Sequence, residues 1–157
     1  MNKSELKEKI LSGKKQRIII CSKLGTGKTT FLKQLFIDAN KCGLTPIFVD
    51  CSELNVRNKN SSSSNVKNSI YGYILSKYVG DISALEKTSD IALNNYLEQS
   101  FKKSRRRILL IIDSVEFLDN VAKENIINEL KDINRIENIS IVYSTHLIED
   151  ADKNAFE

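Results

Sequence analysis

Residues 18–36 of the chain are IIICSKLGTGKTTFLKQLF, a segment that combines three kinds of local structure. The apolar run Ile18–Ile20 is typical of a buried parallel strand. Gly25 and Gly27 then permit a tight turn, because glycine adopts backbone conformations that a Cβ atom disfavours. After the turn, apolar residues recur at helical spacing. The segment therefore predicts a strand buried on both faces, a glycine-containing turn and an amphipathic helix over about residues 28–40.

The turn matches the phosphate-binding pattern G-x-x-x-x-G-K-[ST], with Ser22 in place of the first glycine. Phosphate oxygens need several converging backbone N–H groups, and a helix that starts there adds the positive end of its dipole. In this arrangement Lys28 reaches the β- and γ-phosphates, and the Thr29 hydroxyl holds Mg²⁺. A plain strand-to-helix turn is the alternative. The candidate nucleotide-binding residues are Ser22, Lys23, Leu24, Gly25, Thr26, Gly27, Lys28, Thr29 and Thr30.

A second apolar run, residues 108–112, ends in an acid. An aspartate at such a strand end can hold Mg²⁺ through water beside the Thr29 hydroxyl, so Asp113 is the second candidate metal ligand. An acid a few residues later can orient the attacking water. Glu116 is the candidate for this catalytic role, and Asp119 stands behind it.

The run Ile139–Tyr143 predicts a fourth strand that ends in the polar residues 144–146. A polar group there would lie between the phosphate loop and the acidic strand, within reach of a γ-phosphate. Thr145 and His146 are therefore sensor candidates, and a strand end with polar surface residues is the alternative. The candidate catalytic residues are then Lys28, Glu116 and His146.

The remaining residues predict further elements of an α/β fold, and we treat 1–157 as one domain. A lead-in occupies residues 1–16. The polar, serine-rich segment 55–69 has little to bury and predicts a flexible loop. The expected elements are helices at 3–12, 70–80, 81–104 and 121–135 and a strand at 46–51. Within 81–104 the candidate core residues are Leu85, Ile91, Leu93, Tyr96, Leu97 and Phe101.

The composition is that of an ordinary α/β chain, with 41% hydrophobic and 28% charged residues and a net charge of +4. Three cysteines with no C-x-x-C pair and no signal peptide predict reduced thiols and a cytoplasmic location. No apolar run is long enough to cross a bilayer. A single histidine, His146, removes most histidine-based nucleophilic schemes.

The densest basic cluster precedes the third strand. Such a cluster could meet nucleic acid or an acidic protein. Cations at a helix C-terminus also complement the helix dipole and stay solvated, and we favour this second interpretation. The cluster consists of Lys102, Lys103, Arg105, Arg106 and Arg107.

The phosphate loop, the acidic strand end and the polar strand end together resemble the additional-strand branch of P-loop NTPases, which contains the AAA+ and STAND ATPases. The chain is most similar to NACHT-type STAND domains, because Asp113 and Glu116 follow that group's D-G-x-D-E segment and Tyr143–His146 follows its T-S-R strand end. The resemblance implies a three-layer α/β core with a mainly parallel sheet in the order 1-4-3-2. It also implies ATP and Mg²⁺ as ligands, and a nucleotide-gated signalling or defence switch with a protein partner or self-association.

The chain departs from that family at Ser22, Ser114 and His146, where glycine, glutamate and arginine are common. The family fold also continues into a fifth strand and a helical lid, whereas this sequence stops at Glu157. We therefore expect strand one to be an open edge, unless a longer protein, another chain or residues 1–11 cover it. Slow or absent ATP turnover by the isolated chain is the corresponding expectation.

Two rival functions remain open. A AAA+-like helper that acts on DNA would have the same phosphate loop, and the basic cluster favours it. A nucleotide-binding scaffold that does not hydrolyse ATP is supported by Ser114 and by the short C-terminal part. ATP is preferred over GTP because the sequence has no N-K-x-D motif.

Overall fold

The computed structural model describes residues 2–23, 25–54, 69–78 and 90–146. Leu24, nearly all of the predicted loop at 55–69 and the first part of the helix expected at 81–104 lie outside these ranges. The described elements are α1 (Lys3–Leu11), β1 (Arg17–Cys21), α2 (Lys28–Lys41), β2 (Thr45–Asp50), α4 (Ile70–Tyr78), α6 (Asp90–Lys103), β3 (Ile108–Asp113), the 3₁₀ turn η2 (Val115–Phe117), α7 (Asn120–Asn134) and β4 (Ile139–Thr145).

The described strands form one parallel sheet in the order β1-β4-β3-β2, which confirms the predicted order. The register aligns Cys21 at the end of β1 with Thr145 of β4, and Asp50 of β2 with Asp113 of β3. The C-terminal ends of all four strands therefore lie on the same side of the sheet. Ligand-binding groups of open α/β sheets collect at the C-terminal ends of the strands.

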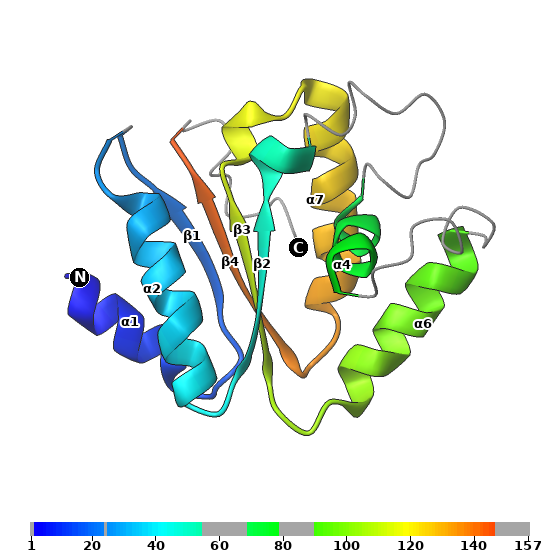
Figure 1. The fold of residues 1–157 in the computed structure, drawn as a ribbon, viewed down its shortest axis with the longest axis horizontal. Coiled ribbons are helices and arrows are strands. Elements are labelled where there is room, and N and C mark those ends of the chain that lie inside the picture. Colours follow the sequence, from blue (N-terminus) through cyan, green and yellow to red (C-terminus); the bar gives the residue numbers. More distant parts are fainter. Residues whose placement is uncertain (1, 24, 55–68, 79–89, 147–157) are drawn as a thin grey trace.

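Helices cover both faces of the sheet and make three layers. α1 and α2 lie on one face, and α4, α6 and α7 lie on the other (Figure 1). Each face has its own apolar core, because the side chains of a strand alternate between the two faces. Leu32 and Leu35 of α2 pack on the first face, and Ile126 and Leu130 of α7 pack on the second.

The two central strands are more deeply buried than the edge strand that leads to the phosphate loop. Every residue of β3 and β4 is buried, whereas Ile18–Ile20 of β1 are only partly buried. The expectation that β1 is buried on both faces is wrong. In the observed order β1 lies at an edge, and it has a strand neighbour on one side only.

The core prediction for the helix that precedes β3 holds only in part. Leu97 and Phe101 of α6 are buried, but Tyr96 is 63% exposed, so it lies on the solvent side of the helix. Leu85 and the side chains of Ile91 and Leu93 lie outside the described part of the chain. Within the described ranges, no helix combines the length and the apolar character that a membrane span requires.

Candidate nucleotide-binding site

The turn between β1 and α2 has the backbone conformation that its glycines predict. Gly25 has φ +78° and Gly27, the N-cap of α2, has φ +81°, a left-handed region that favours glycine. Among the described non-glycine residues only Ser114 has a positive φ, so Ser22 occupies its position without strain. The serine that replaces the first motif glycine is thus compatible with the loop.

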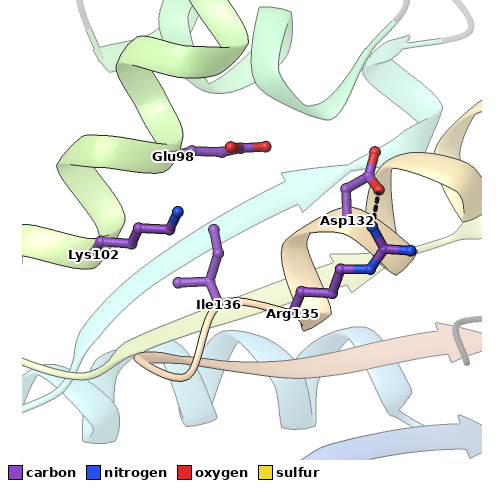
Figure 2. Close-up of a pocket in the computed structure, with 5 residues that line it drawn as sticks. All are labelled: Glu98, Lys102, Asp132, Arg135 and Ile136. Carbon is purple, nitrogen blue, oxygen red and sulfur yellow. Dashed lines mark ion pairs between the residues drawn. The ribbon is translucent and has the colours of Figure 1, made fainter.

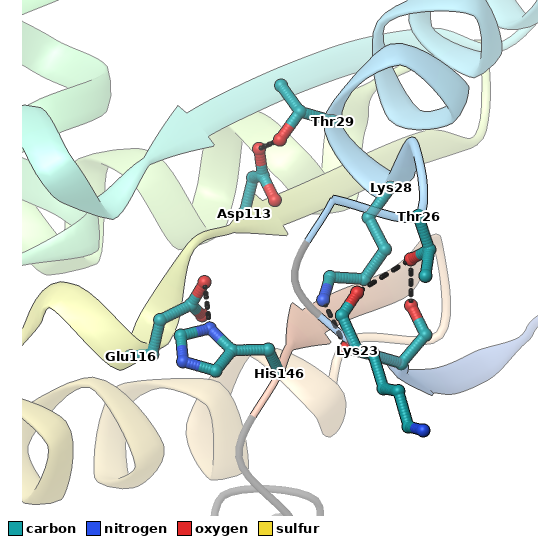
Figure 3. Close-up of polar contacts among 8 residues, drawn as sticks. Lys23, Thr26, Lys28, Thr29, Asp113, Glu116 and His146 are labelled. Carbon is teal, nitrogen blue, oxygen red and sulfur yellow. Dashed lines mark hydrogen bonds and ion pairs between the residues drawn. The ribbon is translucent and has the colours of Figure 1, made fainter.

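Polar contacts close the loop on itself (Figure 3). The Lys28 ammonium donates to the Ser22 carbonyl oxygen at 2.5 Å. The Thr26 hydroxyl donates to the Lys23 carbonyl oxygen at 2.8 Å, and it lies 2.8 Å from the Ser22 hydroxyl. The N-terminus of α2 follows directly, so backbone N–H groups and the helix dipole meet at the same place.

The two candidate metal ligands are in direct contact. The Thr29 hydroxyl donates to Asp113 Oδ2 at 2.9 Å, although the two residues lie 84 positions apart. Asp113 is 3% exposed and stands at the end of β3. Hydroxyl and carboxylate oxygens are the hard ligands that Mg²⁺ accepts, usually together with water and substrate phosphates. These residues therefore fit a magnesium–nucleotide complex.

Glu116 and His146 form a second pair beside the first (Figure 3). His146 Nδ1 lies 2.8 Å from Glu116 Oε1, and the Glu116 side chain is only 7% exposed. The other carboxylate oxygen, Oε2, is buried and has no hydrogen-bond partner within the described part of the chain. The left-handed Ser114 and the buried Val115 fix the turn that carries Glu116. One oxygen of this carboxylate thus lies next to the imidazole, and the other is buried in the described part of the chain.

One hollow of about 390 Å³ gathers most of these groups. Residues of the phosphate loop, of the end of β3 and of η2 line this hollow. A volume of this order suits a small-molecule site. Its lining residues are Gly25, Thr26, Gly27, Lys28, Thr29, Thr30, Asp113, Ser114, Glu116 and Phe117.

Not every predicted residue lies in this hollow. Thr145 is fully buried within β4, and His146 reaches the site through Glu116 instead of lining it. The Asp119 side chain accepts a hydrogen bond from the Ala122 N–H at 2.8 Å, so Asp119 caps α7. Its reserve role as the water-positioning acid is therefore not supported. Leu24 lies outside the described residues.

Two residues near the site were missed by sequence reasoning. Phe117 lines the hollow and is 53% exposed. The sequence did offer a signal for it, because this aromatic residue comes shortly after the acid that ends the third strand. Lys3 of α1 places its ammonium 3.5 Å from the Thr26 carbonyl oxygen. No local signal connects two residues that far apart in the sequence.

The basic cluster lies at the opposite end of the sheet, where the strands begin. Lys102 and Arg135 flank a cavity of about 200 Å³ together with Glu98, Asp132 and Ile136 (Figure 2). Both acidic and basic side chains therefore line this cavity. Arg135 and Asp132 form an ion pair of 3.6 Å that is largely exposed to solvent.

Arg107 differs from the rest of the cluster, because its guanidinium group is hydrogen-bonded to backbone carbonyl oxygens of two other loops. It donates to the Gly13 carbonyl oxygen at 2.8 Å and to the Glu137 carbonyl oxygen at 2.6 Å. The Asn138 side chain adds hydrogen bonds to the loop before β3, including one of 3.0 Å to the Ser104 carbonyl oxygen. These hydrogen bonds join the loops that precede β1, β3 and β4, and we call the three joined loops the frame. Four basic residues are exposed beside this frame: Lys102, Lys103, Arg105 and Arg106.

The parallel sheet order, the glycine-rich loop before α2 and the acid at the end of β3 define a P-loop NTPase core. A family model described as an AAA domain matches residues 11–148, and the chain belongs to that family. Among curated protein sequences, none matches the chain significantly.

Solved structures support the same fold. The chain is similar to the Aeropyrum pernix ORC1 protein in complex with DNA, with a TM-score of 0.65 and 17% identity over 98% of this chain. It is also similar to Drosophila ORC bound to DNA, with a TM-score of 0.60 and 15% identity over 98% of this chain. The chain spans 41% and 38% of the lengths of those two proteins.

Proposed function

We propose that the chain binds ATP with Mg²⁺ at the phosphate loop and hydrolyses it slowly. The contact between Thr29 and Asp113, in the same hollow as Lys28, carries this proposal. Thr29 and Asp113 would hold Mg²⁺, which when bound would neutralise phosphate charge. The loop N–H groups and the Lys28 ammonium would then hold the β- and γ-phosphates.

Glu116 has the position that a water-orienting acid needs, because it lines the hollow beside the phosphate loop. Its Oε1 lies 2.8 Å from His146 Nδ1, and the Glu116 side chain contributes to the same hollow as the loop. In this scheme the Glu116 carboxylate accepts a hydrogen bond from the attacking water, and the adjacent His146 imidazole limits the directions that the carboxylate can take. His146 therefore acts as a positioning residue for Glu116.

The hydrolysis step has a direct test. Replacing Glu116 with Gln retains the shape of the side chain and removes its ability to accept a proton. The rate of phosphate release should then fall by at least about tenfold, since general-base catalysis is typically worth a factor of 100 to 10,000. ATP binding should persist. If phosphate release is absent in the unmodified chain as well, the scaffold that does not hydrolyse ATP becomes the better account.

We further propose that this module works as a nucleotide-gated switch. The STAND-like segment around Asp113 and Glu116 supports this role, as does the contact that joins the acidic turn to the end of β4. A switch of this kind would pass the nucleotide state to a protein partner or to a second copy of the chain. Treating residues 1–157 as a single functional unit belongs to the same proposal.

A DNA-associated ATPase is the second candidate, and one specific observation favours it. The exposed residues Lys102, Lys103, Arg105 and Arg106 stand on a frame that the Arg107 and Asn138 side chains hold together. The similar ORC1 and ORC structures were determined with DNA. Phosphate contacts by such residues should make binding strongly dependent on salt.

Duplex binding of the unmodified chain and of Arg105→Glu/Arg106→Glu separates the two roles. A DNA-associated protein should bind duplex with an affinity that falls steeply between about 50 and 200 mM salt, and the double variant should lose this binding. A variant with Lys33→Glu/Lys9→Glu, on α2 and α1, serves as the charge-matched control. Equal binding by all three proteins would remove the cluster from the account.

A further inference from the structure

Three contacts of the phosphate loop converge on Thr26. Its hydroxyl donates to the Lys23 carbonyl oxygen at 2.8 Å and lies 2.8 Å from the Ser22 hydroxyl. A threonine hydroxyl has a single proton, so the second contact must be donated by Ser22. The Thr26 carbonyl oxygen in turn faces the Lys3 ammonium at 3.5 Å. The Thr26 hydroxyl and the Thr26 carbonyl oxygen therefore each contact other residues.

None of these contacts is specified by the phosphate-binding pattern. The pattern leaves the residue at Thr26 open and asks for glycine where Ser22 stands. A glycine there could not donate a hydrogen bond from its side chain. Because Ser22 has no positive φ, its backbone does not need the freedom of glycine. The departure from the pattern therefore adds a contact and introduces no backbone strain.

The Lys3 contact connects this loop to a helix that is firmly attached elsewhere. Ile10 of α1 is 1% exposed and packs in the apolar core beneath α2. Lys7 of α1 forms an ion pair with Asp38 of α2. Asn2 and Glu5 cap the start of α1 reciprocally, which fixes the backbone that carries Lys3. The Lys3 contact therefore joins the loop to a helix that packs against α2.

We infer that this brace, made of Ser22, Thr26 and Lys3, pre-organises the phosphate loop, with Ser22 and Lys3 as positioning residues. The inference rests on the proposed nucleotide binding, since it concerns the same loop. Binding costs free energy when a loop must be ordered, and a loop that is ordered beforehand avoids part of this cost. The brace orients the peptide between Thr26 and Gly27, directly before the N–H groups that start α2.

The sharpest consequence is that restoring the pattern should weaken the site. Ser22→Gly matches the phosphate-binding pattern better, but it removes the hydroxyl and adds backbone freedom. Ser22→Ala removes the hydroxyl alone. Losing one hydrogen bond should lower ATP affinity about three- to tenfold in Ser22→Ala. The loss in Ser22→Gly should be larger. An affinity equal to or above that of the unmodified chain in Ser22→Gly overturns the inference.

A double-mutant cycle separates a brace from two independent contacts with the nucleotide. Thr26→Val breaks the same hydrogen bond from its other side, so Ser22→Ala/Thr26→Val should bind ATP no more weakly than Thr26→Val alone. Losses that add in the double variant would mean that each hydroxyl contacts the nucleotide by itself, which contradicts a brace. Ser12→Ala, which removes an exposed serine hydroxyl after α1, is the matched control.

The contribution of Lys3 to the brace can be tested with a control substitution on the same helix, α1. Lys3→Ala should lower ATP affinity about two- to fivefold, as expected for a single exposed contact. Lys9→Ala, another exposed lysine of α1, should not change the affinity. An equal effect of both substitutions would indicate a general loss of positive charge and would remove Lys3 from the brace.

Hydrogen exchange without nucleotide keeps the inference separate from the proposed function. In Ser22→Ala the amides of the loop should exchange faster, while those of β3 and β4 stay unchanged. Faster exchange in a chain that binds no ATP would support the brace and reject the nucleotide role. Unchanged exchange, together with unchanged ATP affinity, would reject the brace and leave the nucleotide role intact.

Discussion

His146 Nδ1 lies 2.8 Å from Glu116 Oε1, so the end of β4 contacts the acid that follows β3. This contact places a candidate sensor and a candidate catalytic acid in one unit. The carboxylate is nearly buried, and without His146 it would have to find another partner or change direction. The pair therefore restricts the direction of the Glu116 carboxylate.

Removing the histidine should uncouple hydrolysis from binding. In His146→Ala we expect the rate of phosphate release to fall at least about tenfold, because a misplaced catalytic group is costly even over short distances. ATP affinity should change less than about twofold, since the imidazole does not line the hollow. Steady-state hydrolysis and calorimetry measure the two quantities. A large loss of affinity with an unchanged rate would place His146 on the nucleotide instead.

The Thr29–Asp113 contact predicts which residues confer magnesium dependence. Thr29→Val and Asp113→Asn should lower ATP affinity in the presence of Mg²⁺ to the value that the unmodified chain shows in EDTA. In EDTA the affinities of variant and unmodified chain should agree within about threefold. Thr29→Ser retains the hydroxyl and should keep the magnesium dependence. Binding that stays magnesium-dependent in Asp113→Asn would refute the assignment of that residue.

Glu129 predicts a pH dependence of stability. Its carboxylate accepts hydrogen bonds from the Ile70 and Tyr71 N–H groups at 3.0 and 3.3 Å, yet burial raises its pKa to about 7 from the usual 4.5. The folded state therefore binds the proton more tightly than the unfolded state. The resulting stabilisation is present below pH 4.5 and decreases as the pH rises towards 7.

The free energy of unfolding should thus fall by up to about 3 kcal/mol between pH 4.5 and 7 through this group alone. Glu129→Gln cannot ionise and should show a flatter profile over the same range. Denaturant titrations at several pH values measure the difference. Glu124→Gln, on an exposed position of α7, should follow the unmodified chain. Parallel profiles for the unmodified chain and Glu129→Gln would contradict the assignment.

Ile10 predicts how strongly α1 is attached. It is 1% exposed in the core beneath α2, so Ile10→Ala should destabilise the fold by about 2–5 kcal/mol. Val121→Ala, at a side chain that is 70% exposed, should change the stability by less than about 0.5 kcal/mol. Thermal and denaturant unfolding measure both effects. Similar small effects in the two variants would mean that α1 is only loosely attached.

Much of the fold could be predicted from the sequence, because apolar runs and glycine turns are local signals. The order of the sheet came from a family resemblance and was confirmed. Local signals do not reveal how deeply a strand is covered, which is why β1 was expected to be buried on both faces although its apolar residues are only partly buried. The core prediction for Tyr96 was wrong for a related reason, since helical spacing alone did not tell which side of α6 is buried.

The candidate site was predictable where a motif carries its chemistry and unpredictable where contacts are distant. Thr29 and Asp113 were paired by the roles that their motifs imply, and they do meet. Asp119 was a reserve catalytic acid from its charge, whereas its position before α7 makes it a helix cap. The Lys3 contact depends on how α1 packs, and no sequence pattern encodes that packing.

The most direct test of the nucleotide site is calorimetric titration of the chain with ATP in the presence and absence of Mg²⁺. The account predicts saturable, magnesium-dependent binding that weakens at least about 100-fold in Lys28→Ala, because the charged contact to the phosphates is lost. Lys33→Ala, an exposed lysine further along α2, should bind like the unmodified chain. No magnesium-dependent binding by the unmodified chain, or equal binding by Lys28→Ala, would contradict the account.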